Sequence, residues 1–157
     1  MEKSVPNAAR LYTPESAHVA RTFLADLRQS HRDLLAQIQR LEAMSYEAEP
    51  DRTALTTLRW KLGQASLARR LLSSRICAYF ESRCDPEEAK ALQSLRNADR
   101  EMLRKSAAHL GKWTARTIVR DWTGYCRDGR AMRRRAHDHV ALEQRVLYPL
   151  LERAAHI

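Results

Sequence analysis

Apolar residues in this chain recur at alternating spacings of three and four, which is the pattern of one buried face of an α-helix. The clearest stripe consists of Leu24, Leu27, His31, Leu34, Ile38 and Leu41. A stripe of this kind has to be covered by other helices, so it predicts a helical bundle and excludes a sheet of alternating strands. Four glycines and five prolines in 157 residues, with 30% charged residues, agree with long helices that have solvated outer faces.

Capping signals divide the chain into four long helices. Thr13-Pro14 begins the first, Asp51 the second and Asp85-Pro86 the third, since a short polar cap followed by proline is typical of a helix start. The predicted helices run from 13 to about 44–48, from 51 to about 82, from 85 to about 111 and from either 121 or 129 to about 155, with a short helical piece over 114–119. Short connections then predict an all-α, antiparallel up-and-down four-helix bundle over residues 13–157, after a poorly anchored lead-in at residues 1–12.

A net charge of +9 comes largely from arginine, which is concentrated near the start of the last helix. The basic patch consists of Arg127, Arg130, Arg133, Arg134 and Arg135. It is open to two interpretations: a surface for nucleic acid or anionic lipid, or the solvated face of a long helix. The sequence carries no nucleic-acid-binding motif and no aromatic residues between the basic ones, which favours the solvated face.

Other sequence signals restrict the function. The chain has no apolar run of about 18 residues and no apolar signal segment at its start, so neither a membrane span nor secretion is predicted. Three cysteines without a CxxC pair are typical of reduced thiols in the cytoplasm. No nucleophile–base constellation or phosphate-binding loop is present, so no enzyme is predicted. A homodimer or a protein partner stays open, because no residue argues for either.

His139 and Glu143 are the most informative polar residues. They are four residues apart, so they share one face of the last helix with Val146 and Leu150. A buried imidazole and carboxylate need a partner, either a metal ion or another side chain.

Two segments resemble the hemerythrin-like, HHE cation-binding domains: SHRDLL at 30–35 and HVALEQRVLYPLL at 139–151. The resemblance covers roughly residues 18–155. It implies an up-and-down four-helix bundle with a non-haem di-iron centre held by histidines and bridging carboxylates. It also implies oxygen binding, or the sensing and handling of iron, oxygen or nitric oxide. By matching position, His31, His139 and Glu143 fall on metal-ligand positions, and His109 is a candidate fourth ligand.

The chain departs from that pattern in its second helix. A faint internal repeat with an offset of 69 residues places Arg70 opposite His139 and Ser74 opposite Glu143, where the family has a second His-x-x-x-Glu. Arginine is permanently cationic and cannot ligate a metal, so Arg70 is expected to repel a second iron or to pair with Glu143.

Three functions follow from these observations. The favoured one is a structural, sensory or partner-binding module with an eroded di-metal site, no oxygen-carrier activity and no cofactor. The second is a non-haem protein that binds iron or another divalent metal through His31, His109, His139 and Glu143 and senses oxygen, nitric oxide or iron. The third is a basic module for nucleic acid or anionic lipid.

Overall fold

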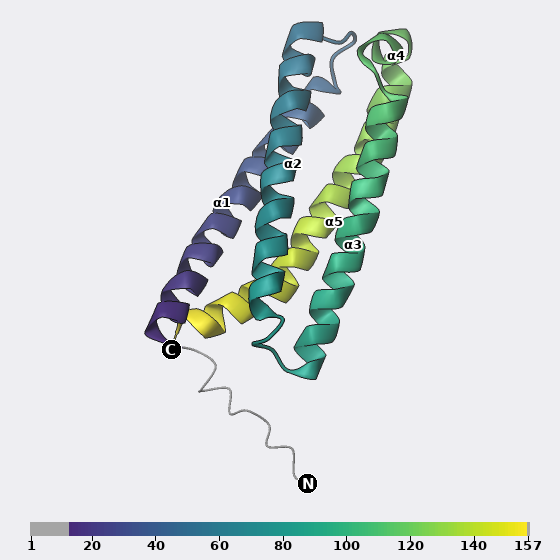
Figure 1. Cartoon of the computed structure of the whole chain (residues 1–157). Helices are drawn as coiled ribbons and strands as arrows, with labels where there is room; N and C mark the ends of the chain where they lie inside the picture. Colours follow the sequence, from purple (N-terminus) through teal and green to yellow (C-terminus); the bar gives the residue numbers. More distant parts are fainter. Residues whose placement is uncertain (1–12, 157) are drawn as a thin grey trace.

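The computed structural model describes residues 13–156, so the predicted lead-in at residues 1–12 lies outside the described part. Within that part every regular element is helical, which confirms the all-α class. The elements are α1 (Pro14–Met44), α2 (Arg52–Phe80), α3 (Pro86–Lys112), α4 (Ala115–Arg120) and α5 (Trp122–Ala155). Four long helices lie alongside one another, and the short α4 closes one end (Figure 1).

The predicted helix starts are confirmed by the capping contacts. Thr13 Oγ1 accepts a hydrogen bond from the backbone N–H of Ser16 at 3.2 Å, and Asp51 Oδ1 accepts one from Ala54 at 3.1 Å. Asp85 and Glu88 form a reciprocal capping box at the start of α3. Each contact satisfies a donor that the first turn of a helix leaves unpaired, and such caps are worth about 1 kcal/mol.

The sequence allows the last long helix to start at residue 121 or at residue 129, and in the structure α5 starts at Trp122. Asp121 Oδ1 accepts from the backbone N–H of Gly124 at 2.9 Å, and α5 then runs without a break through Gly129. Gly129 is buried, and a β-carbon there would lie 3.2 Å from Arg133 Nη1. The missing side chain therefore leaves room for the Arg133 guanidinium.

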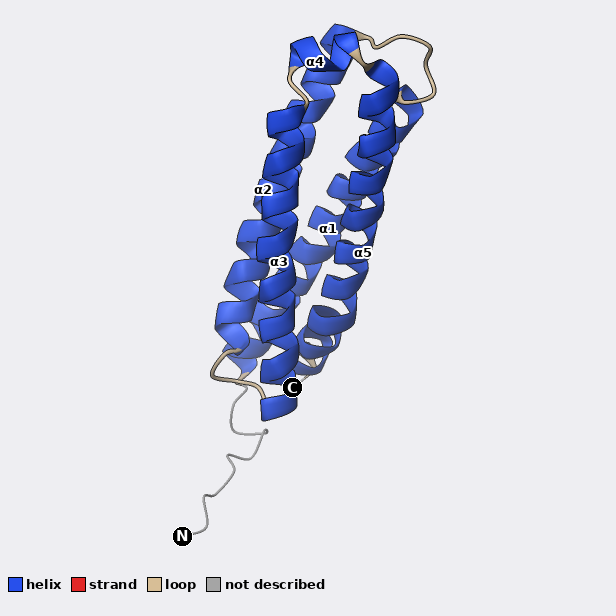
Figure 2. Cartoon of the chain, turned by 90° about the vertical axis from the view of Figure 1, so that its right-hand side faces the viewer, coloured by secondary structure: helices blue, strands red, loops and turns tan. Residues whose placement is uncertain are grey.

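The connections alternate between the two ends of the molecule. The α1–α2 connection and α4 lie at one end, while the α2–α3 connection lies at the other end, near the carboxyl end of α5 (Figures 1 and 2). α1 packs along both α2 and α5, but α3 packs mainly on α5 and touches α2 only lightly. No helix in residues 13–156 combines the length and apolarity needed to cross a membrane.

The core has three apolar clusters. One surrounds Phe80, Leu95 and Leu147, where α2 ends and α3 begins. The second surrounds Trp113 near α4, and a smaller third one contains Ile38 of α1. Polar side chains from all four long helices meet beside these clusters, and they form the candidate site.

Candidate functional site: a buried ion-pair cluster

A connected set of side chains crosses the centre of the molecule, and we call it the central polar cluster. Its members are Tyr148, His31, Glu143, Ser73, Arg69, Asp99 and His139. The Tyr148 hydroxyl lies 2.7 Å from His31 Nδ1, and His31 Nε2 lies 3.0 Å from Glu143 Oε1. Because an ionised carboxylate only accepts, Nε2 carries the hydrogen, and in the neutral ring Nδ1 accepts from the tyrosine.

Arg69 joins the two halves of the cluster. Its Nη1 lies 2.9 Å from Glu143 Oε2, and both of its terminal nitrogens donate to Asp99 Oδ1, at 3.3 and 3.4 Å. His139 Nε2 lies 2.7 Å from the same Asp99 oxygen. One guanidinium therefore bridges two carboxylates, and each carboxylate also has a histidine beside it.

Local helix geometry explains why these side chains meet. His31 occupies one position of the apolar stripe of α1, which faces both α2 and α5. Arg69 and Ser73 on α2 are four residues apart, as are His139 and Glu143 on α5, so each pair projects from a single helix face. The cluster thus contains two i, i+4 pairs, a histidine from α1 and Asp99 from α3.

Five of the seven members of the cluster are buried, whereas Asp99 and Tyr148 are half-buried. The exposed fraction is 0% for Glu143, 2% for His31, 5% for Arg69 and 7% for His139. Charges buried to this degree are tolerated only when they are paired and hydrogen-bonded. Two carboxylates against one guanidinium leave one negative charge in excess.

Both carboxyl groups are held in the ionised form. Burial acts to raise the pKa of Glu143, but the hydrogen bond from His31 and the charge of Arg69 outweigh it and bring that pKa below its ordinary value. Burial likewise opposes ionisation of Asp99, while His139 and Arg69 lower its pKa. At neutral pH the cluster therefore contains two carboxylates and a guanidinium.

Not every close approach in the cluster is an aligned hydrogen bond. Ser73 Oγ, His139 Nε2 and Glu143 Oε2 are buried, and none of them makes a hydrogen bond of good angle. The last two nevertheless have close neighbours: His139 Nε2 lies 2.7 Å from Asp99 Oδ1, and Glu143 Oε2 lies 2.9 Å from Arg69 Nη1. Asp99, His139 and Glu143 also offer ligand atoms that all lie within 4.8 Å of one another. Carboxylate oxygens and an imidazole nitrogen suit a divalent ion such as zinc, iron or manganese. The donor set fits a metal only in part, because Arg69 lies against two of its three members.

The structure brings together three of the four predicted metal ligands: His31, His139 and Glu143. His109 does not join them. It lies on α3 ten residues beyond Asp99, about 15 Å along the helix, where its ring stacks on Tyr125 with centroids 5.9 Å apart. Burial lowers the pKa of His109, so its ring is neutral at pH 7. Asp99 is the residue that α3 contributes.

The prediction for α2 was wrong by one residue. Arg69 and Ser73, and not Arg70 and Ser74, face His139 and Glu143, so the two helices correspond with an offset of 70 residues. Ser74 is exposed, and Arg70 is half-buried in the wall of a neighbouring cavity. The buried stripe of α2 includes Ser73 and Ile76, and Arg69 lies one turn before Ser73 on that face.

The sequence held a signal for one of the missed members. Asp99 continues the stripe of Leu92 and Leu95 toward Met102 at spacings of four and three, so a carboxylate on a buried face was visible. The sequence held no such signal for Tyr148. Its side chain is half-buried, and its place in the sequence does not indicate that the hydroxyl contacts His31.

The basic patch on α5 does not form one uniform face. Four of its members are exposed, whereas Arg133 is half-buried and lines the same cavity as Arg70. The patch therefore combines a solvated surface with one arginine that turns inward.

Comparison with protein families, with curated proteins and with solved structures finds no match to this chain, so the likeness to hemerythrin-like domains is carried by its own residues alone.

Proposed function

We propose that the chain is a hemerythrin-like, antiparallel four-helix bundle in which an ion-pair network stands in place of a di-metal centre. It acts as a structural, sensory or partner-binding module without oxygen-carrier activity. The observation that carries this proposal is Arg69, whose Nη1 lies 2.9 Å from Glu143 Oε2 in the buried centre of the molecule. Arg69 and Ser73 take the place where the resemblance calls for a second His-x-x-x-Glu.

Electrostatics explains why Arg69 and a second metal ion exclude each other. A guanidinium has no free electron pair to donate, and it remains charged at any pH a protein survives. A cation about 4 Å from it is repelled by about 4 kcal/mol per unit charge at an effective dielectric constant of 20. Arg69 also contacts both Glu143 and Asp99, so it balances one of their two negative charges without a metal ion.

The test restores the missing ligands. The double substitution Arg69→His/Ser73→Glu places a second His-x-x-x-Glu opposite His139 and Glu143. We expect the natural chain, purified without chelator, to contain no stoichiometric iron, and the double variant to bind iron with near-stoichiometric occupancy. Elemental analysis and the visible absorption spectrum measure both.

Arg70→His/Ser74→Glu is the matched control, because it makes the same chemical change one residue away from the cluster. It is expected to bind no more metal than the natural chain. Two irons per natural chain, with the absorption bands of an oxo bridge, would contradict the proposal.

A second candidate function is the binding of one divalent ion by Asp99, His139 and Glu143. The observation in its favour is that His139 Nε2 and Glu143 Oε2 are buried without aligned hydrogen bonds, as expected of atoms able to accept another partner. An ion held there would provide a Lewis acid, and Arg69 would have to withdraw from Glu143. Titration of the natural chain with Co²⁺ tests it: a saturable spectral change at one ion per chain, lost in His139→Ala, would support this alternative.

A further inference from the structure

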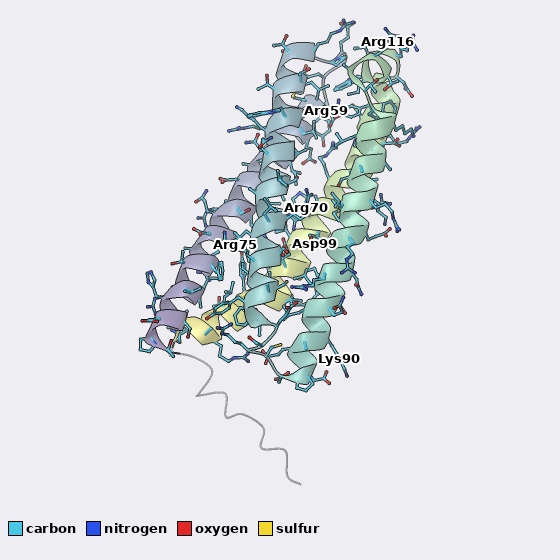
Figure 3. The ribbon with its side chains drawn as sticks, in the orientation of Figure 1. Arg59, Arg70, Arg75, Lys90, Asp99 and Arg116 are labelled. Atoms are coloured by element: carbon cyan, nitrogen blue, oxygen red, sulfur yellow. The ribbon has the colours of Figure 1, made fainter. Side chains whose placement is uncertain are left out.

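A cavity of about 320 Å³ lies beside the central polar cluster, between α2 and α3. It exists because α3 touches α2 only lightly and buries just two of its own residues, Leu92 and Leu95, both near its start. The later part of α3 therefore leaves space beside α2. Arg59 and Arg70 are labelled one above the other in the region between these two helices, with Asp99 just below them (Figure 3).

The walls of the cavity are mainly aliphatic. Leu34 and Ile38 from α1 form a buried surface, and Leu62, Met102 and Met132 are half-buried around it. Among the described residues that line the cavity, Tyr125 is the only phenylalanine, tyrosine or tryptophan. Methionine side chains are flexible and adapt to irregular apolar shapes, so this lining suits an alkyl chain better than a flat ring system. The volume lies at the lower end of the range for small-molecule sites.

The charged residues in the lining all have the same sign. Arg59, Arg69, Arg70 and Arg133 line the cavity, and within residues 13–156 no aspartate or glutamate does. Two of these four are already occupied: Arg59 donates to the Trp113 carbonyl at 2.6 Å, and Arg69 pairs with the carboxylates of the cluster.

The other two arginines, Arg70 and Arg133, are half-buried and have no carboxylate within 4.0 Å among residues 13–156. They come from two different helices that line the cavity, α2 and α5, and Gly129 gives the Arg133 guanidinium the room it occupies. A ligand that suits this cavity has an anionic group, which can bind the half-buried guanidinium groups, and an apolar part, which can pack against the apolar walls.

We propose that this cavity binds a medium-chain fatty acid, with its carboxylate held by Arg70 and Arg133 and its alkyl chain against Leu34, Ile38 and Met102. The proposal goes beyond the function proposed above and does not depend on whether the central polar cluster holds a metal. His139 belongs to both the cluster and the cavity wall, so an occupied cavity is in contact with the cluster.

Calorimetric titration of the full chain with decanoate below its micelle concentration tests the proposal. We expect saturable binding of one decanoate per chain. Decan-1-ol and decylammonium, which keep the chain but lack the negative charge, are expected to bind at least about tenfold more weakly, because a charge-assisted hydrogen bond contributes roughly that factor or more. Equal binding of the alcohol would overturn the assignment of the arginines, and absence of decanoate binding would overturn the proposal.

Two sets of variants check the location. Arg70→Gln and Arg133→Gln are each expected to weaken decanoate binding about tenfold, whereas Arg134→Gln, on the exposed side of α5, leaves it unchanged. Unchanged affinity in both cavity variants would overturn the proposal. Binding to phosphatidylglycerol vesicles without binding of monomeric decanoate would also overturn it, since the surface would then recognise a membrane.

A larger side chain at Gly63 should narrow the cavity without destabilising the fold. It lines the cavity on α2, nothing lies within 4 Å of a β-carbon built there, and glycine is a poor helix former. Gly63→Leu is therefore expected to fold with at least the natural melting temperature and to weaken decanoate binding. Gly111→Leu is the control, because Gly111 is equally open but lies outside the cavity. Equal affinity in the two leucine variants would place the ligand elsewhere and overturn the proposal.

Discussion

Replacing Arg69 by methionine removes the guanidinium of the central polar cluster while keeping much of the side-chain volume. Glu143, with no exposed surface, then loses its charged partner at 2.9 Å. Removing one member of a buried ion pair costs about 3–5 kcal/mol, since the other charge is left uncompensated. We therefore expect the free energy of unfolding at pH 7 to fall by about 3 kcal/mol or more.

The free energy of protonating Glu143 gives a second value to compare with this loss of stability. The ordinary pKa of Glu143 is 4.5, so keeping that carboxyl group protonated at pH 7 costs about 3.4 kcal/mol at 1.36 kcal/mol per pH unit. The same step costs less than about 1 kcal/mol at pH 5. The destabilisation by Arg69→Met should therefore shrink markedly between pH 7 and pH 5.

Urea unfolding followed by far-ultraviolet circular dichroism measures both values. Arg70→Met is the matched control, because Arg70 is the next residue on α2 and has no carboxylate partner among residues 13–156; its expected cost is about 1 kcal/mol or less. The double variant Arg69→Met/Glu143→Leu should recover much of the lost stability. A loss below about 1 kcal/mol at pH 7, or an equal loss at pH 7 and pH 5, would refute the reasoning.

Three further predictions concern the natural cluster and its surroundings. Because the folded pKa values of Asp99 and Glu143 lie below the ordinary 3.8 and 4.5, their contribution to stability is complete above about pH 5 and disappears as the pH falls through the lowered values; thermal melting from pH 7 to pH 3 should show this loss. Tyr148→Phe removes the hydroxyl that contacts His31 and should cost about 0.5–1.5 kcal/mol in urea unfolding, and an unchanged midpoint would show that this contact adds nothing. Burial raises the pKa of the Cys77 thiol, so Cys77 should react with a disulfide reagent only on unfolding, after the two less buried cysteines; rapid labelling in the folded chain would contradict its position.

The parts of the fold that follow from local rules were predictable from the sequence. The caps at Thr13, Asp51 and Asp85 act within one turn, and the apolar stripes fix which face of each helix is buried. His139 and Glu143 could be paired for the same reason, since residues four apart on a helix share a face whatever the helix packs against.

The parts that depend on how helices slide and rotate against each other were not predictable. Aligning two helices with an error of one residue corresponds to a rotation of about 100°, and this is the difference between Arg70 and Arg69. The level at which α3 meets α5 decides whether Asp99 or His109 reaches the cluster, and no spacing within α3 contains that information. The cavity is invisible in the sequence for a related reason, because it results from the light contact between α2 and α3.

The position of the cluster among the apolar parts of the core has a consequence for the uniqueness of the fold. Apolar stripes tolerate axial slippage, because a leucine that moves by one turn meets another leucine. A polar group does not, since a slip of about 5.4 Å in α2, α3 or α5 would separate a carboxylate from the guanidinium, and the same slip in α1 would take the His31 ring away from Glu143. All four long helices contribute a member, so we expect the cluster to fix the relative heights of all of them at once, as a single polar residue fixes the alignment of a coiled coil.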